Sequence, residues 1–560
     1  MNLTNTSVFK AELNMNSHAN KKVLIIGVDA GTWDVLKPAM DQGFMPNLKN
    51  LIDTGASGIL KSTMPAITPA AWSCFQTGVN PGQNGVFNFS YWDKHLKTQK
   101  FVNSNSLATT IWDTASSIGK HVGLLNVPMT YPPHKINGCM VTGILTPSIK
   151  SNFTYPDKLK KQLLNAVSGY HIFNLGNASA GQPHKNFEGF VQRMADIVES
   201  RFQAAEFILN KEDPFDIFMV HFQATDIIQH VMWGYMDKAH SLYDAGKHKY
   251  ILENFYHLLD EKIESVCRTF EKKSGGDFLT LVVSDHGSEA HNKRFNLGSW
   301  LLQEGLLKLN PLPYKPSLLK KITRKFNVGA FLKRFIAAGT VAKMEKIIDN
   351  PYQQFAWERS KAFSFGKSGE GYIYLLEENQ DQREKTVSAL IKKLEAICDP
   401  ETNTAIAKNV FRKEQIYHGE ALDKIPDIII EPAPGYSFTG SCKPDQPLFH
   451  KVCPDSDFHI AKHHMDGIIV AAGPGIQHNN SIFADLVDIV PTLSYYLDLP
   501  IDQNTDGKIV QRLFTEEFLT KNQLPQKTDT DSTTKAESGD TYSKKDEDQI
   551  RQRLEELGYM

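Results

Sequence analysis

The chain has 560 residues, of which 41% are hydrophobic and 22% are charged, and these ordinary proportions exclude a mainly disordered protein. Its 61 lysines and arginines nearly balance its 63 acidic residues, so the net charge of −2 gives no reason to expect binding to nucleic acid duplexes. Six cysteines without a Cys-x-x-Cys pair are too sparse for a disulfide scaffold. Because the N-terminus is polar and no run approaches ~20 apolar residues, we expect a cytoplasmic protein with reduced thiols.

Short apolar runs rich in valine and isoleucine recur along the chain and predict its strands. The runs do not alternate with polar residues, and long stretches with helical spacing separate them, which is typical of a sheet covered on both faces. The runs cover residues 23–28, 217–222, 278–283, 427–432 and 467–472, and the helical stretches cover residues 187–209, 250–272 and 381–397. The sequence therefore predicts an α/β fold with a central, mostly parallel sheet and helices on both faces, whose site lies at the carboxyl ends of the strands.

A basic region interrupts this pattern. Residues 315–346 contain nine basic residues and one acidic residue, a net charge of +8 against −10 for the rest of the chain. We expect residues 305–354 to form a helical insertion with this basic stretch at its centre. It could be a cap with solvated lysines, a lid that attracts an anionic substrate, or a surface that binds an anionic membrane weakly and reversibly.

The remaining boundaries follow from composition. The predicted units are a flexible N-terminus (1–20), the main α/β domain (21–304 and 355–520), a disordered linker (525–549) and a short C-terminal helix (550–560). The linker is assigned because it contains almost no apolar residues. In the final segment Ile550, Leu554 and Leu557 fall on one helical face, and Ser543 with Asp546 could cap that helix.

Acidic and histidine side chains follow three of the predicted strands. Asp29 ends the segment VLIIGVD, Asp285 and His286 end FLTLVVSDH, and Asp226 ends IFMVHFQATD. His230 comes four residues after Asp226, so a helix there would present both side chains on one face. Each aspartate alone could be only a helix cap or a turn residue. Together they are informative, because one fold would bring all three positions to the same edge of the sheet.

Aspartate and histidine without cysteine suit divalent metal ions, Zn²⁺ first, with Mn²⁺ or Mg²⁺ as alternatives. His463 and His464 precede the run at 467–472 and add two more imidazoles. Five or six such ligands exceed what one tetrahedral ion needs and fit two divalent ions. A two-metal site clamps the entering and leaving oxygens of an in-line displacement at phosphorus.

Such a site needs a nucleophile, and the segment TPAAW offers Thr68. Pro69 favours the first position of a helix, which would make Thr68 the N-cap residue. The helix dipole and the free N–H groups would then favour an anion at this point, either an alkoxide or a phosphate. A Thr-Pro pair alone is usually only a cap, so the hypothesis depends on the neighbouring ligand residues.

These motifs occur in a characteristic order: Asp29 in VDAG, Thr68 in TPAAW, Asp226 with His230, SDHG at 284–287, and the His-x-x-Asp of 463–466. In this order they resemble the alkaline phosphatase superfamily, and within it the type I phosphodiesterase/nucleotide pyrophosphatase-like phosphohydrolases. The resemblance covers about residues 21–515 apart from the basic insertion, and DIVPTLSYYLDLP at 488–500 and the terminal LEELGY look similar as well. It implies an alkaline phosphatase-like fold.

The resemblance also implies roles for individual residues. One ion would be held by Asp29, Thr68, Asp285 and His286, and the other by Asp226, His230 and His463. His463 is chosen over His464 because Asp466 sets the register of the His-x-x-Asp pattern. Thr68, activated as an alkoxide, would attack phosphorus and form a phospho-threonine that water then hydrolyses.

Departures from related families narrow the expected activity. Cys74 is followed by FQTG rather than by the sulfatase pattern, which disfavours a sulfatase. Nucleotide pyrophosphatases carry an asparagine that contacts a phosphoryl oxygen; here Phe89 takes the aligned position and Asn88, the candidate substrate-binding residue, lies one position earlier.

We therefore expect a metal-dependent hydrolase of phosphodiester or pyrophosphate bonds acting on an anionic phosphate-ester substrate, and less readily on monoesters. The alternatives are a phosphomutase or phospho-group transferase on the same scaffold, and an inactive metal-binding protein that docks on anionic surfaces through residues 315–346.

Overall fold

The computed structural model describes residues 21–93, 98–172, 183–310, 351–366, 369–442, 444, 446–454, 457–528 and 542–559. The predicted flexible N-terminus and the basic stretch at 315–346 lie outside these described residues, so what we expect of them stays a prediction. Within the described ranges, no helix is both long enough and apolar enough to cross a membrane.

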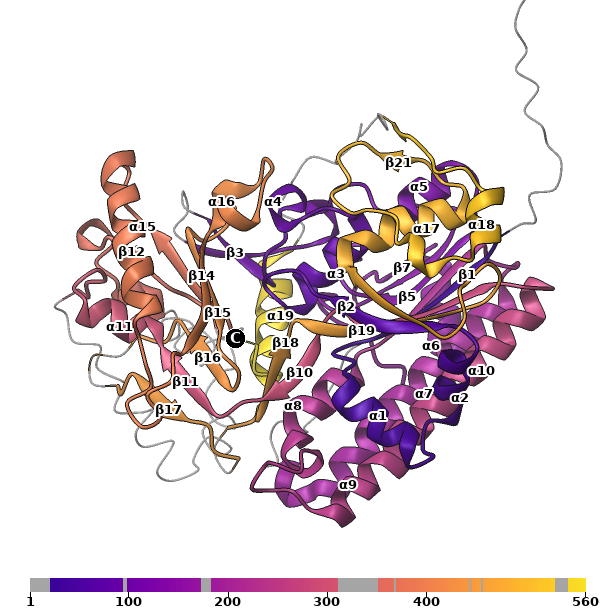
Figure 1. The fold of residues 1–560 in the computed structure, drawn as a ribbon, viewed down its shortest axis with the longest axis horizontal. Coiled ribbons are helices and arrows are strands. Elements are labelled where there is room, and N and C mark those ends of the chain that lie inside the picture. The colour runs from indigo at the N-terminus through magenta and orange to yellow at the C-terminus, as the bar shows by residue number, and fades with distance from the viewer. Residues whose placement is uncertain are drawn as a thin grey trace, which may run out of the picture.

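The larger part of the molecule is built on a nine-stranded sheet with the order β20-β2-β19-β9-β1-β8-β5-β6-β7 (Figure 1). Five neighbouring strands run parallel, namely β9 (Leu279–Val283), β1 (Val23–Val28), β8 (Ile217–Phe222), β5 (Val122–Val127) and β6 (Gly138–Thr142). The outer strands are β19 (Asp466–Ala472), β2 (Ala56–Lys61), β20 (Asn480–Asp485) and β7 (Thr154–Tyr155). Strand β19 is antiparallel to both of its neighbours, and β7 is antiparallel to β6. The predicted mostly parallel sheet is confirmed.

Strand β1 shows why the sheet carries helices on both faces. All six residues of β1 are buried. Leu24 and Ile26 belong to one hydrophobic core, and Val23 and Ile25 belong to another. Because successive side chains of a strand point to opposite faces, a strand without polar alternation must be covered twice.

The two helical layers supply this cover (Figure 1). The first core includes residues of α1 (Trp33–Asp41), α2 (Pro46–Asp53), α6 (Lys158–Ala166), α7 (Phe187–Lys211), α8 (Ala224–Met236), α9 (Ala245–Ile251) and α10 (His257–Ser274). The second core includes residues of α3 (Thr68–Thr77), α5 (Ile111–Ser117) and α17 (Ile489–Leu497).

A smaller part, on the left in Figure 1, has its own hydrophobic core. It contains a four-stranded sheet of β12 (Ala362–Phe363), β13 (Gly371–Leu375), β15 (Ile428–Pro432) and β14 (Ala407–Arg412), and a three-stranded sheet of β16 (Tyr436–Thr439), β11 (Lys293–Asn296) and β17 (Phe449–Lys451), with α11 (Leu297–Gln303) and α15 (Gln380–Glu395). The apolar run at 427–432 therefore lies in an antiparallel sheet of the smaller part, which corrects its assignment to the central sheet. An apolar run shows that a strand is buried but not which sheet it joins.

The C-terminal helix is longer than its apolar pattern predicts. Helix α19 (Lys544–Glu556) begins six residues before position 550 and takes in the last residues of the predicted linker. Ser543 and Asp546 form the expected capping box at its start, which explains why the polar first turn is helical. Upstream, β22 (Lys527–Thr528) pairs with β21 (Ile501–Asp502), and residues 529–541 of the linker lie outside the described part of the chain. In Figure 1 α19, in yellow, lies between the larger and the smaller part.

Candidate active site

The first group of candidate ligands, which we call the acid cluster, consists of Asp29, Asp285 and His286. Asp29 directly follows β1, and the other two residues come just after β9. Because β1 and β9 are parallel neighbours, their carboxyl ends bring the three side chains together. Nε2 of His286 lies 3.2 Å from Oδ2 of Asp285 and 3.9 Å from Oδ1 of Asp29. All three residues are completely buried.

The acid cluster lacks internal charge balance. Burial raises the pKa of Asp29 well above its ordinary value, and the charges of Asp285 and Asp226 raise it further. Burial also raises the pKa of Asp285 to about 8, although the backbone N–H of Ala30 donates a 3.1 Å hydrogen bond to its Oδ1. Within the described part of the chain, both oxygens of Asp29, Oδ2 of Asp285 and Nε2 of His286 are buried without a hydrogen-bond partner. Such atoms are stabilised by a bound cation, so the acid cluster fits a divalent ion.

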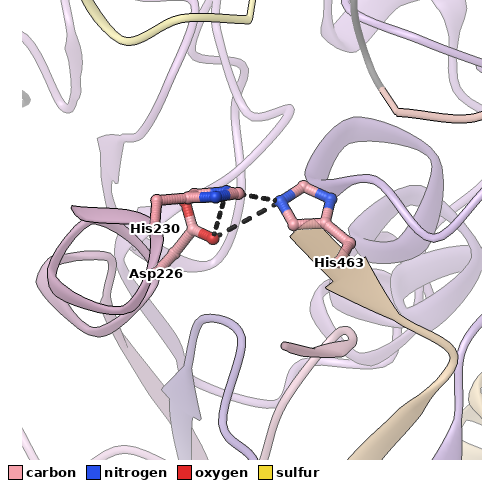
Figure 2. A group of neighbouring side chains, drawn as sticks. All are labelled: Asp226, His230 and His463. Carbon is pink, nitrogen blue, oxygen red and sulfur yellow. Dashed lines mark hydrogen bonds and ion pairs between the residues drawn. The ribbon is translucent and has the colours of Figure 1, made fainter. Parts of the chain in front are cut away.

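The second group, which we call the imidazole cluster, consists of Asp226, His230 and His463 (Figure 2). Asp226 and His230 lie one turn apart on α8, and His463 lies on β18 (Ala461–His464), which pairs with β10 (Gly287–Ala290). Oδ1 of Asp226 is 3.1 Å from Nε2 of His230 and 3.4 Å from Nε2 of His463, and the two Nε2 atoms are 2.9 Å apart. Figure 2 shows the three groups pointing toward one another.

The charges within the imidazole cluster balance each other. Burial alone would raise the pKa of Asp226, but the charge and hydrogen bonds of His230 and His463 lower it well below its ordinary value. Burial would lower the pKa of His230, but Asp226 raises it. For His463 burial dominates and lowers the pKa. Unlike the acid cluster, this group holds its carboxylate in the ionised state by itself.

The three histidines share a hydrogen-bond arrangement that suits a metal ligand. Each ring turns its Nδ1 toward a backbone carbonyl: His286 to Gly287 at 3.1 Å, His230 to Ala461 at 2.9 Å, and His463 to Ala66 at 2.7 Å. A carbonyl can only accept, so Nδ1 must carry the proton, and in the neutral ring Nε2 then presents its lone pair. The three Nε2 atoms are the atoms that face the clusters, which is the arrangement found in metal-binding histidines.

The two clusters adjoin. The rings of His286 and His463 stack with their centroids 3.8 Å apart. The charge of Asp226 also raises the pKa values of both carboxyls of the acid cluster. The two clusters therefore form one continuous site.

Thr68 lies at the start of α3, beside this site. The helix begins at Thr68 itself, because the carbonyl of Ile67 accepts the first hydrogen bond of the helix, at 2.9 Å from the amide of Ala71. The prediction that Thr68 is the N-cap residue is thus wrong by one position, and Ile67 takes that place. Oγ1 of Thr68 is buried without a hydrogen-bond partner in the described structure. The hydrogen bond between His463 and the carbonyl of Ala66 ties the loop before Thr68 to the imidazole cluster.

Two further predicted positions lie outside the clusters. The ring of His464 is not one of the grouped ligands; its Nδ1 accepts a 3.2 Å hydrogen bond from the backbone N–H of Asp466. The side chain of Asn88 accepts a 2.7 Å hydrogen bond from the N–H of Phe89, the residue before β3 (Ser90–Asp93). A substrate-binding role for Asn88 stays a prediction.

The sequence patterns missed three residues at the site. His221, on β8, places its Nε2 2.9 Å from Oδ2 of Asp29, and burial with the charge of Arg201 lowers its pKa to about 3. A histidine inside the apolar run IFMVHF is the signal that could have marked it. His459 stacks on the ring of His230 with 4.1 Å between centroids, and no pattern marks it. Tyr559, the penultimate residue of the sequence, donates a hydrogen bond to Oδ2 of Asp226.

A cavity of about 280 Å³ opens beside the imidazole cluster. His230, His463 and Tyr559 form part of its wall, and Arg294 and Lys462 add positive charge. No acidic residue lines it in the described part of the chain. The cavity can therefore receive a polar or anionic group next to the candidate metal ligands.

Comparison with known proteins identifies the family. The sequence profile of the type I phosphodiesterase / nucleotide pyrophosphatase family matches residues 23–466. Among curated proteins, none matches the chain by sequence. Among solved structures, phosphonoacetate hydrolase from Sinorhizobium meliloti 1021 is similar with a TM-score of 0.51 and 14% identity, covering 86% of this chain and 96% of that one. Human ectonucleotide pyrophosphatase/phosphodiesterase 5 is similar with a TM-score of 0.49 and 14% identity, covering 89% of this chain and 100% of that one.

The family profile spans most of the chain and includes both clusters, and the fold is alkaline phosphatase-like. The predicted class of enzyme, a hydrolase acting on phosphoric ester bonds, is confirmed. The chain belongs to the type I phosphodiesterase / nucleotide pyrophosphatase family.

Proposed function

We propose that the protein hydrolyses phosphodiester or pyrophosphate bonds through a phospho-threonine on Thr68, with one divalent ion in each cluster. The observation that carries this proposal is the convergence of two buried ligand groups at one edge of the sheet, joined through the stacked rings of His286 and His463. Two ions held side by side suit an in-line displacement at phosphorus. The family is metal-dependent, which agrees with this arrangement.

The two clusters differ in the ions they would prefer. The acid cluster, together with Thr68, offers mainly oxygen atoms, which suit Mg²⁺ and Mn²⁺ as well as Zn²⁺. The imidazole cluster offers two nitrogens and one carboxylate oxygen, a ligand set typical of Zn²⁺. Zn²⁺ in both positions is our first choice because histidine occurs in each cluster. When bound, the ions would supply Lewis acidity that favours ionisation of the Thr68 hydroxyl and offsets the charge on the phosphoryl oxygens.

The residues of the chain account for both chemical steps. Oγ1 of Thr68 attacks phosphorus, the bond from phosphorus to the leaving oxygen breaks, and an alcohol departs with the proton that the threonine loses. Water then attacks the same phosphorus, takes over the phosphoryl group and restores the Thr68 hydroxyl, which yields a phosphate monoester from a diester. In both steps the free N–H groups of the first turn of α3 can donate hydrogen bonds to the phosphoryl oxygens.

The cavity beside the imidazole cluster supports an anionic or strongly polar substrate. Arg294 and Lys462 add positive charge to its wall, although Lys462 also pairs with Glu289 and Arg294 lies 3.4 Å from Asp457. A substrate group that enters the cavity would compete with these ion pairs. This favours polar or anionic groups over apolar ones as the non-reacting part of the substrate.

Turnover of aryl phosphate diesters and monoesters by the purified protein, with metal content measured on the same sample, tests the proposal. We expect the diester to be cleaved faster, in proportion to divalent metal content. Cleavage of monoesters alone would replace the proposed function by that of a phosphatase. Transfer of the phosphoryl group to an added alcohol in preference to water would replace it by that of a transferase.

The nucleophile is tested by Thr68→Ala. The variant should lose at least about 10⁴-fold in kcat, because the covalent route disappears, while its metal content stays high. Ser73→Ala, which removes another buried hydroxyl from α3, is the matched control, since Oγ of Ser73 only bonds the carbonyl of Pro69 at 2.6 Å. Near-normal turnover by Thr68→Ala, or no phosphoryl group on the Thr68 peptide of the quenched wild-type enzyme, would overturn the mechanism.

A further inference from the structure

The last residues of the chain are fixed against the larger part of the molecule. Ile550, Leu554 and Leu557 are buried in the same core as β1. The two terminal nitrogens of Arg553 donate 2.6 Å hydrogen bonds to the carbonyls of Thr146 and Pro147. The apolar face and the paired hydrogen bonds hold α19 in one orientation.

Gly558 turns the chain from α19 into the active site. Its φ is +81°, a conformation that residues with a Cβ rarely adopt. A Cβ at this position would also lie 2.8 Å from Cε1 of His459. The amide of Tyr559 bonds back to the carbonyl of Leu554 at 2.9 Å and closes the turn at the end of the helix. Glycine is therefore needed at 558 for the next side chain to reach the site.

Tyr559 is buried in the imidazole cluster. Its side-chain hydroxyl donates a hydrogen bond to Oδ2 of Asp226. The centroid of its ring lies 5.1 Å from that of Phe89 and 6.0 Å from that of His230, and the residue is only 7% exposed. Tyr559 also forms part of the wall of the cavity next to the cluster.

The two oxygens of Asp226 therefore have different surroundings. Oδ2 is held by Tyr559, whereas Oδ1 lies 3.1 Å from Nε2 of His230 and 3.4 Å from Nε2 of His463. A carboxylate attached to α8 by a single bond could otherwise rotate and present either oxygen. The hydrogen bond at Oδ2 fixes which oxygen is left for the cluster.

We propose that Tyr559 is a positioning residue of the active site: its hydroxyl orients the Asp226 carboxylate so that Oδ1 faces the ion of the imidazole cluster. This inference rests on the proposed function for the identity of the ligands, but it concerns a residue that neither cluster contains. Loss of a hydrogen bond that orients a metal ligand typically costs ~10–100-fold in metal affinity or activity. Tyr559 then contributes to catalysis and not only to stability.

Tyr559→Phe in the 560-residue chain tests the proposal, because it removes the hydroxyl and keeps the ring. The matched control is Tyr495→Phe, since the hydroxyl of Tyr495 bonds the carbonyl of Asn522 at 2.7 Å, outside both clusters. Zn²⁺ affinity is measured on the metal-free proteins by competition with a chelator, together with thermal stability. We expect Tyr559→Phe to weaken one Zn²⁺ site ~10–100-fold and the control to leave both sites unchanged.

Kinetics on an aryl phosphate diester provide the second readout. For Tyr559→Phe we expect a lower kcat that rises again with added Zn²⁺, and a KM within about twofold of the wild-type value, because the hydroxyl acts through Asp226. Unchanged Zn²⁺ affinity, or a loss of thermal stability alone, would overturn the proposal. The affinity measurement decides the matter even if the diester is not a substrate, so failure of the proposed function is distinguishable from failure of this inference.

Discussion

The two clusters lie at the same edge of one sheet and yet have opposite electrostatics. In the acid cluster, burial raises the pKa values of both carboxyls, and their inward oxygens have no hydrogen-bond partner among the described residues. In the imidazole cluster, the two histidines lower the pKa of the single carboxyl, Asp226. The first group needs an external cation to hold its charge, whereas in the second His230, whose pKa Asp226 raises, offsets the charge of the carboxylate.

This difference follows from the elements that supply the candidate ligands. The acid cluster draws its side chains from the ends of two adjacent parallel strands, so the two carboxylates are forced together by the sheet. The imidazole cluster combines one turn of α8 with β18, which leaves space for two rings around one carboxylate. Without metal, the acid cluster should therefore destabilise the fold and the imidazole cluster should support it.

Loss of a ligand from either cluster should have the largest effect. Asp29→Ala and His463→Ala should each lower kcat/KM by about 10³-fold or more, with a matching loss of metal. The two variants should retain different ions. His463→Ala should still bind Mn²⁺ or Mg²⁺ in the acid cluster, and Asp29→Ala should still bind Zn²⁺ in the imidazole cluster. Metal analysis after dialysis against each ion measures this, with the exposed Asp34→Asn as control. Identical metal preferences in the two variants would contradict the comparison.

Removing a carboxylate should change the stability of the metal-free protein in opposite directions in the two clusters: it should stabilise the fold in the acid cluster and destabilise it in the imidazole cluster. Because the pKa of Asp285 is raised to about 8, the carboxyl stays protonated in the fold while it ionises in the unfolded chain, and wild-type stability falls as the pH rises from about 4 to about 8. Asp285→Asn should remove this cost and stabilise the metal-free protein at pH 7 by on the order of 4 kcal/mol.

Asp226→Asn is the opposite case. Because the pKa of Asp226 is lowered, its charge stabilises the fold at neutral pH, and this contribution is lost only as the pH falls below its ordinary value. The substitution should cost about 1.5–3 kcal/mol in the metal-free protein at pH 7. Urea unfolding with and without chelator measures both variants. A loss of stability in metal-free Asp285→Asn would show that the acid cluster is not under electrostatic strain.

The sequence predicts the site residues that follow buried strands, but not those that reach the site from a distant segment. Asp29, Asp226 and Asp285 could be placed at one edge because the end of a buried strand is visible in the sequence and parallel strands align their carboxyl ends. The contact of Tyr559 could not be placed: the terminal LEELGY resembles the family, but nothing in the sequence connects it with Asp226, 333 positions away.

The same limit applies to the fold. The apolar runs predict strands well, but the run at 427–432 joins the smaller part, because sheet membership is decided by tertiary packing. The start of α19 was missed because Lys544 and the polar residues after it form an exposed first turn, held by the cap at Ser543 rather than by apolar spacing.

Glu370 separates the effect of burial from that of metal binding. Glu370 belongs to neither cluster. Burial raises its pKa to about 7, although the hydroxyl of Tyr372 donates a 3.0 Å hydrogen bond to it that acts in the opposite direction. Wild-type stability should therefore fall between pH 4.5 and about 7 relative to Glu370→Gln, which should be more stable by about 3 kcal/mol at pH 8. Thermal unfolding across this pH range, with and without Zn²⁺, measures the difference. The stability gained by Glu370→Gln should be the same with and without Zn²⁺. The stability gained by Asp285→Asn should disappear when metal is bound. If the gain at Glu370 also depended on metal, metal dependence would no longer distinguish the acid cluster from other buried carboxyls.

The smallest effect is expected at His464, the neighbour of a cluster ligand. Successive side chains of β18 point to opposite faces, so when His463 faces Asp226, His464 faces away. Its Nδ1 accepts only a local hydrogen bond from the N–H of Asp466, and no cluster atom depends on it. His464→Ala should therefore change kcat/KM by less than about tenfold and leave Zn²⁺ content unchanged, beside the large loss expected for His463→Ala. Metal content and diester turnover of the two variants, measured in parallel, check this. If His464→Ala lost metal as His463→Ala does, the ring that completes the imidazole cluster would have to be reassigned, and with it the contrast between one cluster that balances its own charge and one that does not.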